Sequence, residues 1–102
     1  MIEVQVFIPV ADNDGYQFSS AEHAAFEEFV AALFGGATRY PDSATGVWFG
    51  GGVLYRDELR VYGIAIASIV DGGKFAQVVE FVKKHYRQLA VCIRHPGGVE
   101  IL

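Results

Sequence analysis

The stretch LRVYGIAIASIV, residues 59–70, decides the fold, because apolar residues occupy both of its faces. Successive side chains of an extended strand point to opposite faces of a sheet. One face of this stretch carries Tyr62 and Ile64, and the other carries Val61 and Ala65. A strand that is apolar on both faces is typical of the centre of a sheet. We therefore expect this segment to be a central strand.

The segments on either side of it predict the order β-α-β-β-α-β. In chain order they are an alternating run at 1–10, a helical pattern at 19–34, strand patterns at 46–56 and 59–70, a second helical pattern at 73–86 and an apolar run at 89–94. The helical patterns repeat apolar residues with the spacing of one buried stripe. This order is the split βαβ plan of a ferredoxin-like α+β domain. We expect a four-stranded antiparallel sheet with two helices on one face, and room for a short fifth strand at 99–102.

Local signals place several boundaries within this plan. Ser19 and Glu22 form a capping box, which predicts the start of the first helix, and the glycines at 35–36 predict its end. The three glycines at 50–52 indicate a bulge or a bend. Asp-Glu at 57–58 lies between two apolar runs, and we expect a tight hairpin there.

Composition bounds the kind of protein. The chain has 102 residues, of which 52% are hydrophobic, so we expect one domain spanning 1–102. Its formal net charge of −4 and scattered basic residues argue against a nucleic-acid partner. No apolar stretch is long enough to span a bilayer and no signal peptide is evident, so we predict a cytoplasmic protein with no membrane partner. We expect no cofactor and no metal, since the single Cys92 lacks the partners of a zinc site.

The sheet face away from the helices is the surface that the pattern leaves to be explained. If alternate residues of the first strand turn toward the helices, Glu3, Gln5 and Phe7 lie on the other face. By the same alternation we assign Trp48 and Arg94 to the uncovered face, together with Arg60 and Tyr62, although the face of the third strand stays open. Aromatic residues mixed with charges are typical of a ligand pocket or a dimer interface.

Catalytic chemistry has weaker support. The three histidines lie in separate predicted elements, and none belongs to a recognised catalytic motif. His23, in the first turn of the first helix, is expected to be exposed. His95, beside a Pro-Gly-Gly turn, is the histidine to test first. The catalytic residues, if there are any, are unknown.

We therefore favour a non-enzymatic homodimer that binds a small molecule or a protein partner on the uncovered face. The candidate ligand-binding residues are Trp48, Arg60, Tyr62, Arg94, Tyr40 and His95. The alternative is a cofactor-independent enzyme of the dimeric α/β-barrel type, acting on a small apolar metabolite between helices and sheet. A closed cavity that contains His85, His95 or Tyr55, with a perturbed titration, would favour the enzyme.

One resemblance to a known family is carried by several short motifs. They are Gly36-Ala37-Thr38-Arg39-Tyr40, Gly46-Val47-Trp48, Tyr62, Gln88-Leu89-Ala90-Val91 and Gly98-Val99-Glu100. The chain resembles, in these motifs, an uncharacterised bacterial family of short proteins of unknown function. The resemblance implies a ferredoxin-like fold and a shared surface at Thr38, Tyr40 and Trp48, and it implies no activity.

Overall fold

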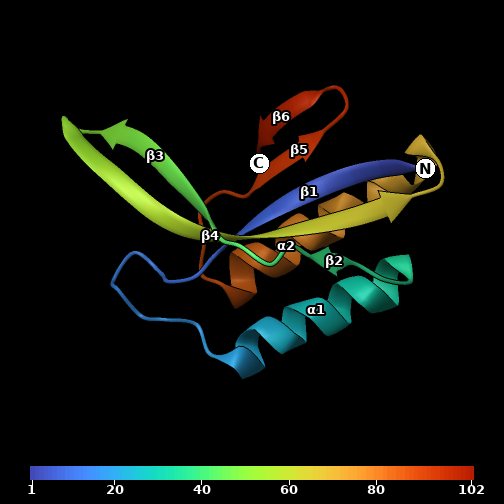
Figure 1. Ribbon diagram of the computed structural model, residues 1–102, viewed down its shortest axis with the longest axis horizontal. Coiled ribbons are helices and arrows are strands. Elements are labelled where there is room, and N and C mark those ends of the chain that lie inside the picture. The colour runs from blue at the N-terminus through green and yellow to red at the C-terminus, as the bar shows by residue number, and fades with distance from the viewer.

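Two helices and six strands make up the fold of this chain (Figure 1). The computed structural model describes residues 1–102, apart from the side chains of residues 69 and 70. In chain order the elements are β1 (Ile2–Pro9), α1 (Ser20–Phe34), β2 (Thr38–Arg39), β3 (Ala44–Gly50), β4 (Val53–Ile66), a 3₁₀ helix (Ile69–Lys74), α2 (Phe75–His85), β5 (Cys92–His95) and β6 (Gly98–Ile101).

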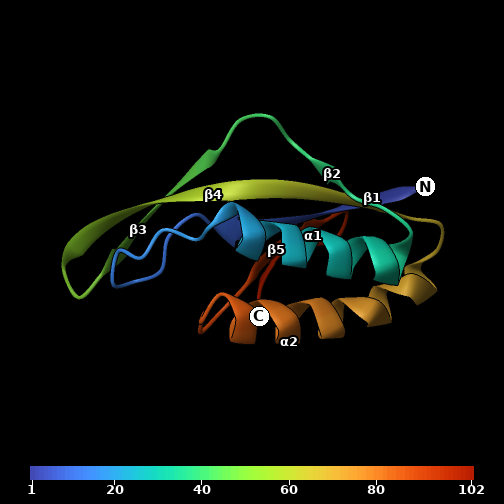
Figure 2. The same ribbon diagram turned by 90° about the horizontal axis from the view of Figure 1, so that it is seen from below.

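The strands form one antiparallel sheet, and both helices lie on the same side of it (Figure 2). The strand order is β2-β4-β1-β5-β6, and β3 pairs with the first half of β4. A mixed α+β fold with two helices was predicted and is confirmed. The sheet has six strands rather than the expected four, because the short β2 and β6 extend it. The extra strand expected near the C-terminus is present as β6, which pairs with β5.

Alternation along β1 builds the core. Val4, Val6 and Ile8 point toward the helices and are at most 4% exposed. The register of β1 against β4 sets Val4 opposite Ile64 and Val6 opposite Tyr62. Tyr62 and Ile64 therefore belong to the same helix-covered face. The sequence left this face of the third strand open, and the pairing with β1 decides it.

Both ends of α1 form as the sequence predicts. The Ser19 hydroxyl accepts the Glu22 N–H, while the Glu22 carboxylate accepts the Ser19 N–H, which completes the capping box. Gly35 ends the helix with a φ of 90°, in the left-handed region that glycine adopts without steric cost. No helix in the described part of the chain is both long and apolar enough to cross a membrane.

The prediction for His23 is wrong, because this side chain is only 3% exposed. Helix α1 turns it toward the end of α2, where its Nδ1 lies 2.8 Å from the hydroxyl of Tyr86. The position of α2 over the first turn of α1 thus converts an expected surface histidine into a buried one.

The hairpin expected at Asp57 and Glu58 is also wrong. The turn lies at Gly51 and Gly52, whose φ angles are 57° and 79°. A two-residue hairpin turn of type I′ needs a positive φ at both central residues, which favours glycine there. Asp57 then pairs with Gly46 inside β4, which is one continuous strand of 14 residues. Glycine at both turn positions makes this turn cheaper than one built on Asp-Glu.

Candidate functional site

An apolar cavity of about 520 Å³ lies between the sheet and the start of α2. We call it the C-terminal cavity, because β5, β6 and the last residue form much of its wall. Its apolar lining consists of Ile2, Val4, Ile66, Phe75, Ala76, Ile93, Pro96 and Leu102. Ligand sites are typically of this size, with mostly apolar walls and a few polar groups. The cavity therefore suits a small organic molecule.

His95 and Glu100 supply the polar side of this cavity. The Nε2 atom of His95 lies 3.1 Å from Oε2 of Glu100. The Gly97 N–H donates to Nδ1 of the same ring at 3.0 Å. Because Nδ1 accepts this bond, we assign the proton of the neutral ring to Nε2, which donates to Glu100. Both ring nitrogens are thus already engaged within the β5–β6 turn.

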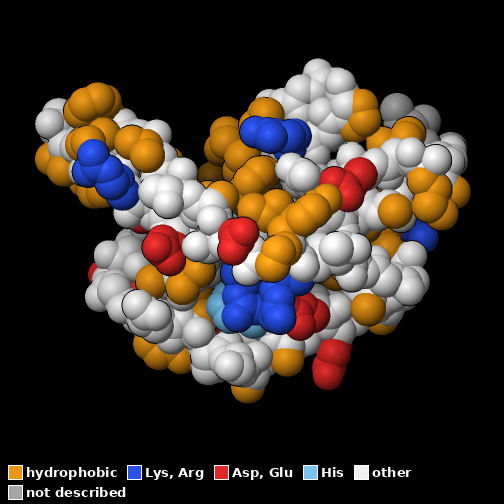
Figure 3. All heavy atoms as spheres, in the orientation of Figure 1, with side chains coloured by type: hydrophobic (Ala, Val, Ile, Leu, Met, Phe, Trp, Pro, Cys, Tyr) orange, Lys and Arg blue, Asp and Glu red, His pale blue; other side chains and the backbone are white. Residues whose placement is uncertain are grey.

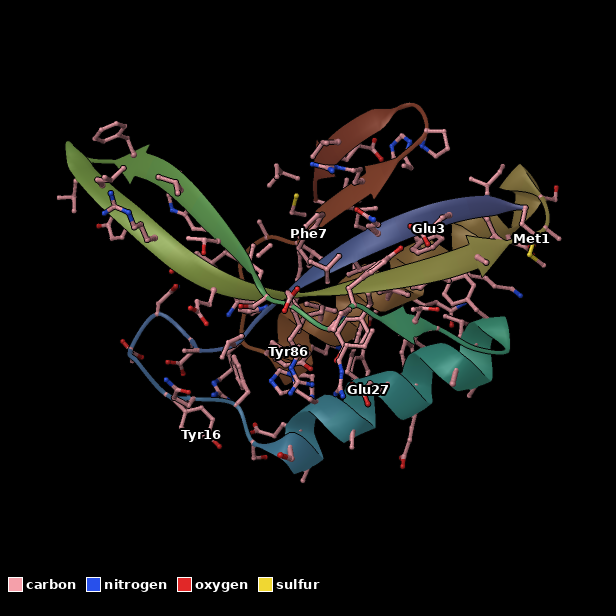
Figure 4. The ribbon with its side chains drawn as sticks, viewed as in Figure 1. Met1, Glu3, Phe7, Tyr16, Glu27 and Tyr86 are labelled. Carbon is pink, nitrogen blue, oxygen red and sulfur yellow. The ribbon has the colours of Figure 1, made fainter. Side chains whose placement is uncertain are left out.

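A second polar group joins α1 to the sheet, and Figure 4 shows its Glu27 on α1. Glu27 Oε2 accepts the Tyr62 hydroxyl at 2.6 Å and lies 3.2 Å from Nη1 of Arg39 and 3.5 Å from Nη1 of Arg60. We call these four residues the Glu27 cluster. Burial, and then the bond to Glu27, raise the pKa of Tyr62. Two guanidinium groups facing one carboxylate leave one positive charge in excess at this edge of the sheet.

The uncovered face of the sheet carries a different pair. The Tyr40 hydroxyl lies 2.7 Å from both carboxylate oxygens of Glu3, and donating to Glu3 raises the pKa of Tyr40. The pair crosses Gly63, where a Cβ would lie 2.7 Å from Oε2 of Glu3. Further along the same face, the Arg94 guanidinium lies 5.8 Å from the centroid of the Phe7 ring. This face is therefore partly covered by its own side chains.

Trp48 lies away from all of these groups. It pairs with Tyr55 in the hairpin of β3 and β4, which projects from the body of the molecule in both ribbon views (Figures 1 and 2). The Trp48 and Tyr55 side chains are each 47% exposed. Figure 3 shows apolar side chains gathered at the end of this hairpin.

The six residues predicted for the site do not come together. The structure brings Arg60 and Tyr62 together in the Glu27 cluster, on the helix-covered side of the sheet and not on the uncovered face. The reason is that Tyr62 pairs with Val6, which points toward the helices. Tyr40 and Arg94 do lie on the uncovered face. Trp48 is on the β3–β4 hairpin and His95 borders the C-terminal cavity.

Sequence reasoning missed Glu27, Arg39 and Glu100. A signal for Glu100 did exist, since the pairing of β5 with β6 sets it opposite Ile93 and thus on the face of His95. Glu27 and Arg39 carry no comparable local signal. They meet Tyr62 only because α1 and β2 both lie beside β4.

The His, Cys, Asp and Glu side chains are the groups that metal binding or thiol chemistry would use. Within that part of the chain, no three His, Cys, Asp or Glu side chains gather closely enough to hold a metal ion. Burial raises the pKa of the Cys92 thiol. A thiol with a raised pKa is a weaker nucleophile at neutral pH, because less of it is thiolate.

Comparison with known proteins shows similarity of fold. No family model matches the chain, and no curated protein matches it. A phage SAM lyase solved in complex with S-methyl-5′-thioadenosine superimposes with a TM-score of 0.69 at 16% identity. A phage SAM lyase in the apo state superimposes with a TM-score of 0.67 at 14% identity. Each match covers 99% of this chain and 86% of the neighbour, and at these identities it establishes the fold alone.

Proposed function

We propose that this protein binds a small, mainly apolar organic molecule in the C-terminal cavity. The observation that carries the proposal is the cavity itself, about 520 Å³ in volume. Its floor is formed by core side chains such as Val4, Ile66 and Ile93, each at most 5% exposed. A ligand bound against these core side chains would extend the hydrophobic core and remove its own apolar surface from water.

The C-terminal cavity is a better candidate than the uncovered face that the sequence favoured. The hollow on that face, beside Glu3 and Gly63, has a volume of only about 280 Å³. The Glu3 carboxylate there is already engaged by Tyr40. The larger and more apolar space lies on the helix side of the sheet.

The ligand class that we propose is an adenosine thioether. Such a molecule joins an aromatic base and a methylthio group, which suit the apolar wall, to a ribose that donates hydrogen bonds. Glu100, which is 57% exposed in its side chain, can accept such a bond at the rim of the cavity. The shared fold supports this class, because the phage SAM lyase was solved with S-methyl-5′-thioadenosine.

The second candidate function is a cofactor-independent enzyme that acts on a sulfonium compound such as SAM and releases an adenosine thioether. The presence of His95 in a cavity between helix and sheet favours it. Against it, His95 has both nitrogens engaged, by Glu100 and by the Gly97 N–H. The ring would have to break one of these bonds to take a proton from a substrate. We therefore place binding ahead of catalysis.

Calorimetric titration of the full chain with S-methyl-5′-thioadenosine, and separately with SAM, tests the binding proposal. Ala76 lines the cavity, so Ala76→Trp fills part of it and should weaken binding about tenfold or more. Ala24→Trp is the matched control, because Ala24 is an exposed alanine of α1 outside the cavity lining. Absence of binding to the unmodified protein, or equal affinity in Ala76→Trp, would refute the proposal.

Incubation with SAM, followed by chromatography for S-methyl-5′-thioadenosine, separates the two candidates. The binding proposal expects no turnover above the rate of SAM alone. Turnover that is lost in His95→Gln would establish the enzyme instead. Turnover that survives this change would show that His95 is not the reacting group.

One further proposal concerns the architecture. We propose that β2, the second half of β4, β1 and β5 are the ferredoxin-like core, and that the hairpin of β3 with the first half of β4 and the strand β6 are additions to it. The resemblance to the uncharacterised bacterial family stays a prediction.

A further inference from the structure

A row of apolar side chains crosses the uncovered face of the sheet. Val6 points toward the helices, so its neighbour Phe7 points to the uncovered face. The register sets Phe7 opposite Val61 on β4 and opposite Cys92 on β5. Cys92 in turn lies opposite Ile101 on β6. Because residues opposite one another in a sheet share a face, four neighbouring strands place an uncharged side chain in one continuous row.

The row continues onto the hairpin of β3 and β4. Leu59 lies two residues before Val61 on β4, so both point to the same face. A Cβ at Gly46 would lie 2.6 Å from Cζ3 of Trp48 and 3.4 Å from Cδ1 of Leu59. The Trp48 ring and the Leu59 side chain therefore lie together over a residue that has no side chain, and Tyr55 lies opposite Trp48. We call the four residues of the row, together with Leu59, Trp48 and Tyr55, the apolar band. Figure 3 shows apolar side chains on this face between the two hairpins.

The apolar band leaves a large surface in water. Trp48 and Tyr55 are each 47% exposed, and Ile101 is 68% exposed. Val53 and Val99 border the band on the same face and are 52% and 55% exposed. These five side chains leave about 500 Å² per chain, near the upper end for a patch on a monomer. Two such surfaces in contact would bury about 1,000 Å², which is the area that a specific interface has to reach. The half-buried members of the band add to this area.

Two charges of opposite sign flank the centre of the apolar band. Asp57 lies between Tyr55 and Leu59 on the same face of β4 and is partly buried. Arg94 lies on the other side of Phe7, with its guanidinium 5.8 Å from the centroid of that ring. The ion pairs that the described residues form involve neither Asp57 nor Arg94. Covering the band would therefore strand the Asp57 carboxylate unless a cation met it.

We propose that a second copy of this chain covers the apolar band face to face, about a two-fold axis that lies midway between Arg94 and Asp57. Such an axis, in the plane of contact and perpendicular to the line joining the two groups, exchanges their positions. It sets Arg94 of each copy opposite Asp57 of the other, so two identical ion pairs close around one apolar centre. A single peptide strand would cover only part of the band. A second copy presents an equal area and the complementary charges.

Sedimentation of the full chain over a micromolar concentration series, followed in parallel by tryptophan fluorescence, tests this proposal. We expect a dimer. Trp48 is the only tryptophan of the chain, so its emission should shift to shorter wavelength over the concentration range in which the dimer forms.

A pair of neighbouring substitutions tests which face makes the contact. Trp48→Lys should raise the dissociation constant about tenfold or more, since it places a charge within the apolar band. Phe49→Lys is the matched control. Phe49 is 76% exposed, but it is opposite Leu54 on the other face of the hairpin. This control should leave the dissociation constant unchanged.

Charge reversal tests whether the partner is a second copy in the proposed arrangement. Arg94→Asp and Asp57→Arg each set like charges opposite one another at two places in the dimer, and each should raise the dissociation constant about tenfold or more. The double variant restores opposite charges and should return the dissociation constant to within about threefold of its original value. Arg56→Asp makes the same charge change on the other face of the hairpin and should have no effect. Circular dichroism and thermal unfolding show whether each variant keeps its fold, and Arg94→Gln with Asp57→Asn, which should each weaken the dimer, replace any that does not.

Several results would overturn the proposal. One is a monomer at every concentration with constant Trp48 emission, and another is a dimer that Trp48→Lys leaves intact or that Phe49→Lys weakens equally. A double charge reversal that binds no more tightly than the single ones would show that Arg94 does not meet Asp57 of a second copy. An assembly larger than two would exclude a closed two-fold contact. The C-terminal cavity lies on the helix side of the sheet, so none of these results bears on ligand binding there.

Discussion

Replacing Tyr86 with phenylalanine tests the buried contact between the two helices. Tyr86 follows the end of α2 and is fully buried, and its hydroxyl lies 2.8 Å from Nδ1 of His23 on α1. Its ring packs edge-on against Phe18, with centroids 4.8 Å apart. Tyr86→Phe keeps this ring packing and removes only the hydroxyl. Any effect then reports on the hydrogen bond to His23.

The structure sets the size of the expected effect. Burial lowers the pKa of His23 and strongly raises the pKa of Tyr86, so both groups are neutral and the hydroxyl donates to Nδ1. Without the hydroxyl, Nδ1 stays buried and unpaired, which costs about 1–3 kcal/mol. In a domain of this size each kcal/mol lowers the melting temperature by about 4–8 °C. The loss is a substantial part of a typical stability of about 5–15 kcal/mol.

Urea unfolding followed by circular dichroism gives the free energy of unfolding and its dependence on urea. Tyr40→Phe is the matched control, because it removes a hydroxyl that is bonded to Glu3 near the surface. We expect the control to cost less than about 1 kcal/mol, as exposed polar contacts do. The urea dependence should be the same in both variants, since neither changes the surface exposed on unfolding.

Equal losses in Tyr86→Phe and Tyr40→Phe would refute this reasoning. That result would mean that the His23 ring finds water or another partner once the hydroxyl is gone. A changed urea dependence in Tyr86→Phe would also contradict it, because the variant would then have altered the folded or unfolded state rather than one bond.

Three further predictions concern the pH dependence of stability, the turn of the β3–β4 hairpin and the N-terminal cap of the first helix. Burial lowers the pKa of His23 in the folded state below the usual 6.5 of the unfolded state. The contribution of the neutral His23 ring to the free energy of unfolding is therefore complete above pH 6.5, and it is lost as the pH falls toward and through the folded-state pKa. Urea unfolding should therefore give a smaller free energy at about pH 5 than at about pH 7, and an identical pH dependence in His23→Gln would count against this assignment. Gly52→Ala should lower the free energy of unfolding by about 1–2 kcal/mol in a thermal melt, because Gly52 has a φ of 79° that alanine adopts only with strain. Gly36→Ala is the control and should leave the free energy of unfolding unchanged, since Gly36 also faces open space but has no such φ. Equal effects of the two substitutions would exclude backbone strain as the cause. Ser19→Ala should cost about 1 kcal/mol by the same measurement, since it removes the acceptor for the Glu22 N–H, and a neutral result would show that water replaces the cap.

Local patterns predicted the elements of this fold well, and where they erred the reason is physical. The Ser19 capping box and Gly35 define α1 through contacts within a few residues, so the sequence carries them in full. The turn at Gly51 and Gly52 was mistaken for a bulge, because a turn and a bulge use glycine for the same conformational freedom. That mistake moved the expected hairpin to Asp57 and Glu58.

The candidate site was less predictable. His95 was selected from its position beside a turn, and it does border the C-terminal cavity. The remainder of the cavity comes from β1, the end of β4, α2 and β6, which are distant in sequence. Trp48, Tyr40 and Arg94 are residue types that are typical of a binding surface. The structure nevertheless separates them, because Trp48 lies on the β3–β4 hairpin and the other two lie on different parts of the sheet.

The order of hydrophobic periods determined, by itself, that this chain has two helices over an antiparallel sheet. Hydrophobic periodicity and helix capping depend on residues only a few positions apart, so both can be recognised in the sequence itself. Only the tertiary structure decided which face of β4 meets the helices, because Val61 and Tyr62 are both large and apolar enough for either side. It also buried His23 against Tyr86, 63 residues away. Such long-range pairs depend on how whole elements pack together, and no local pattern records that.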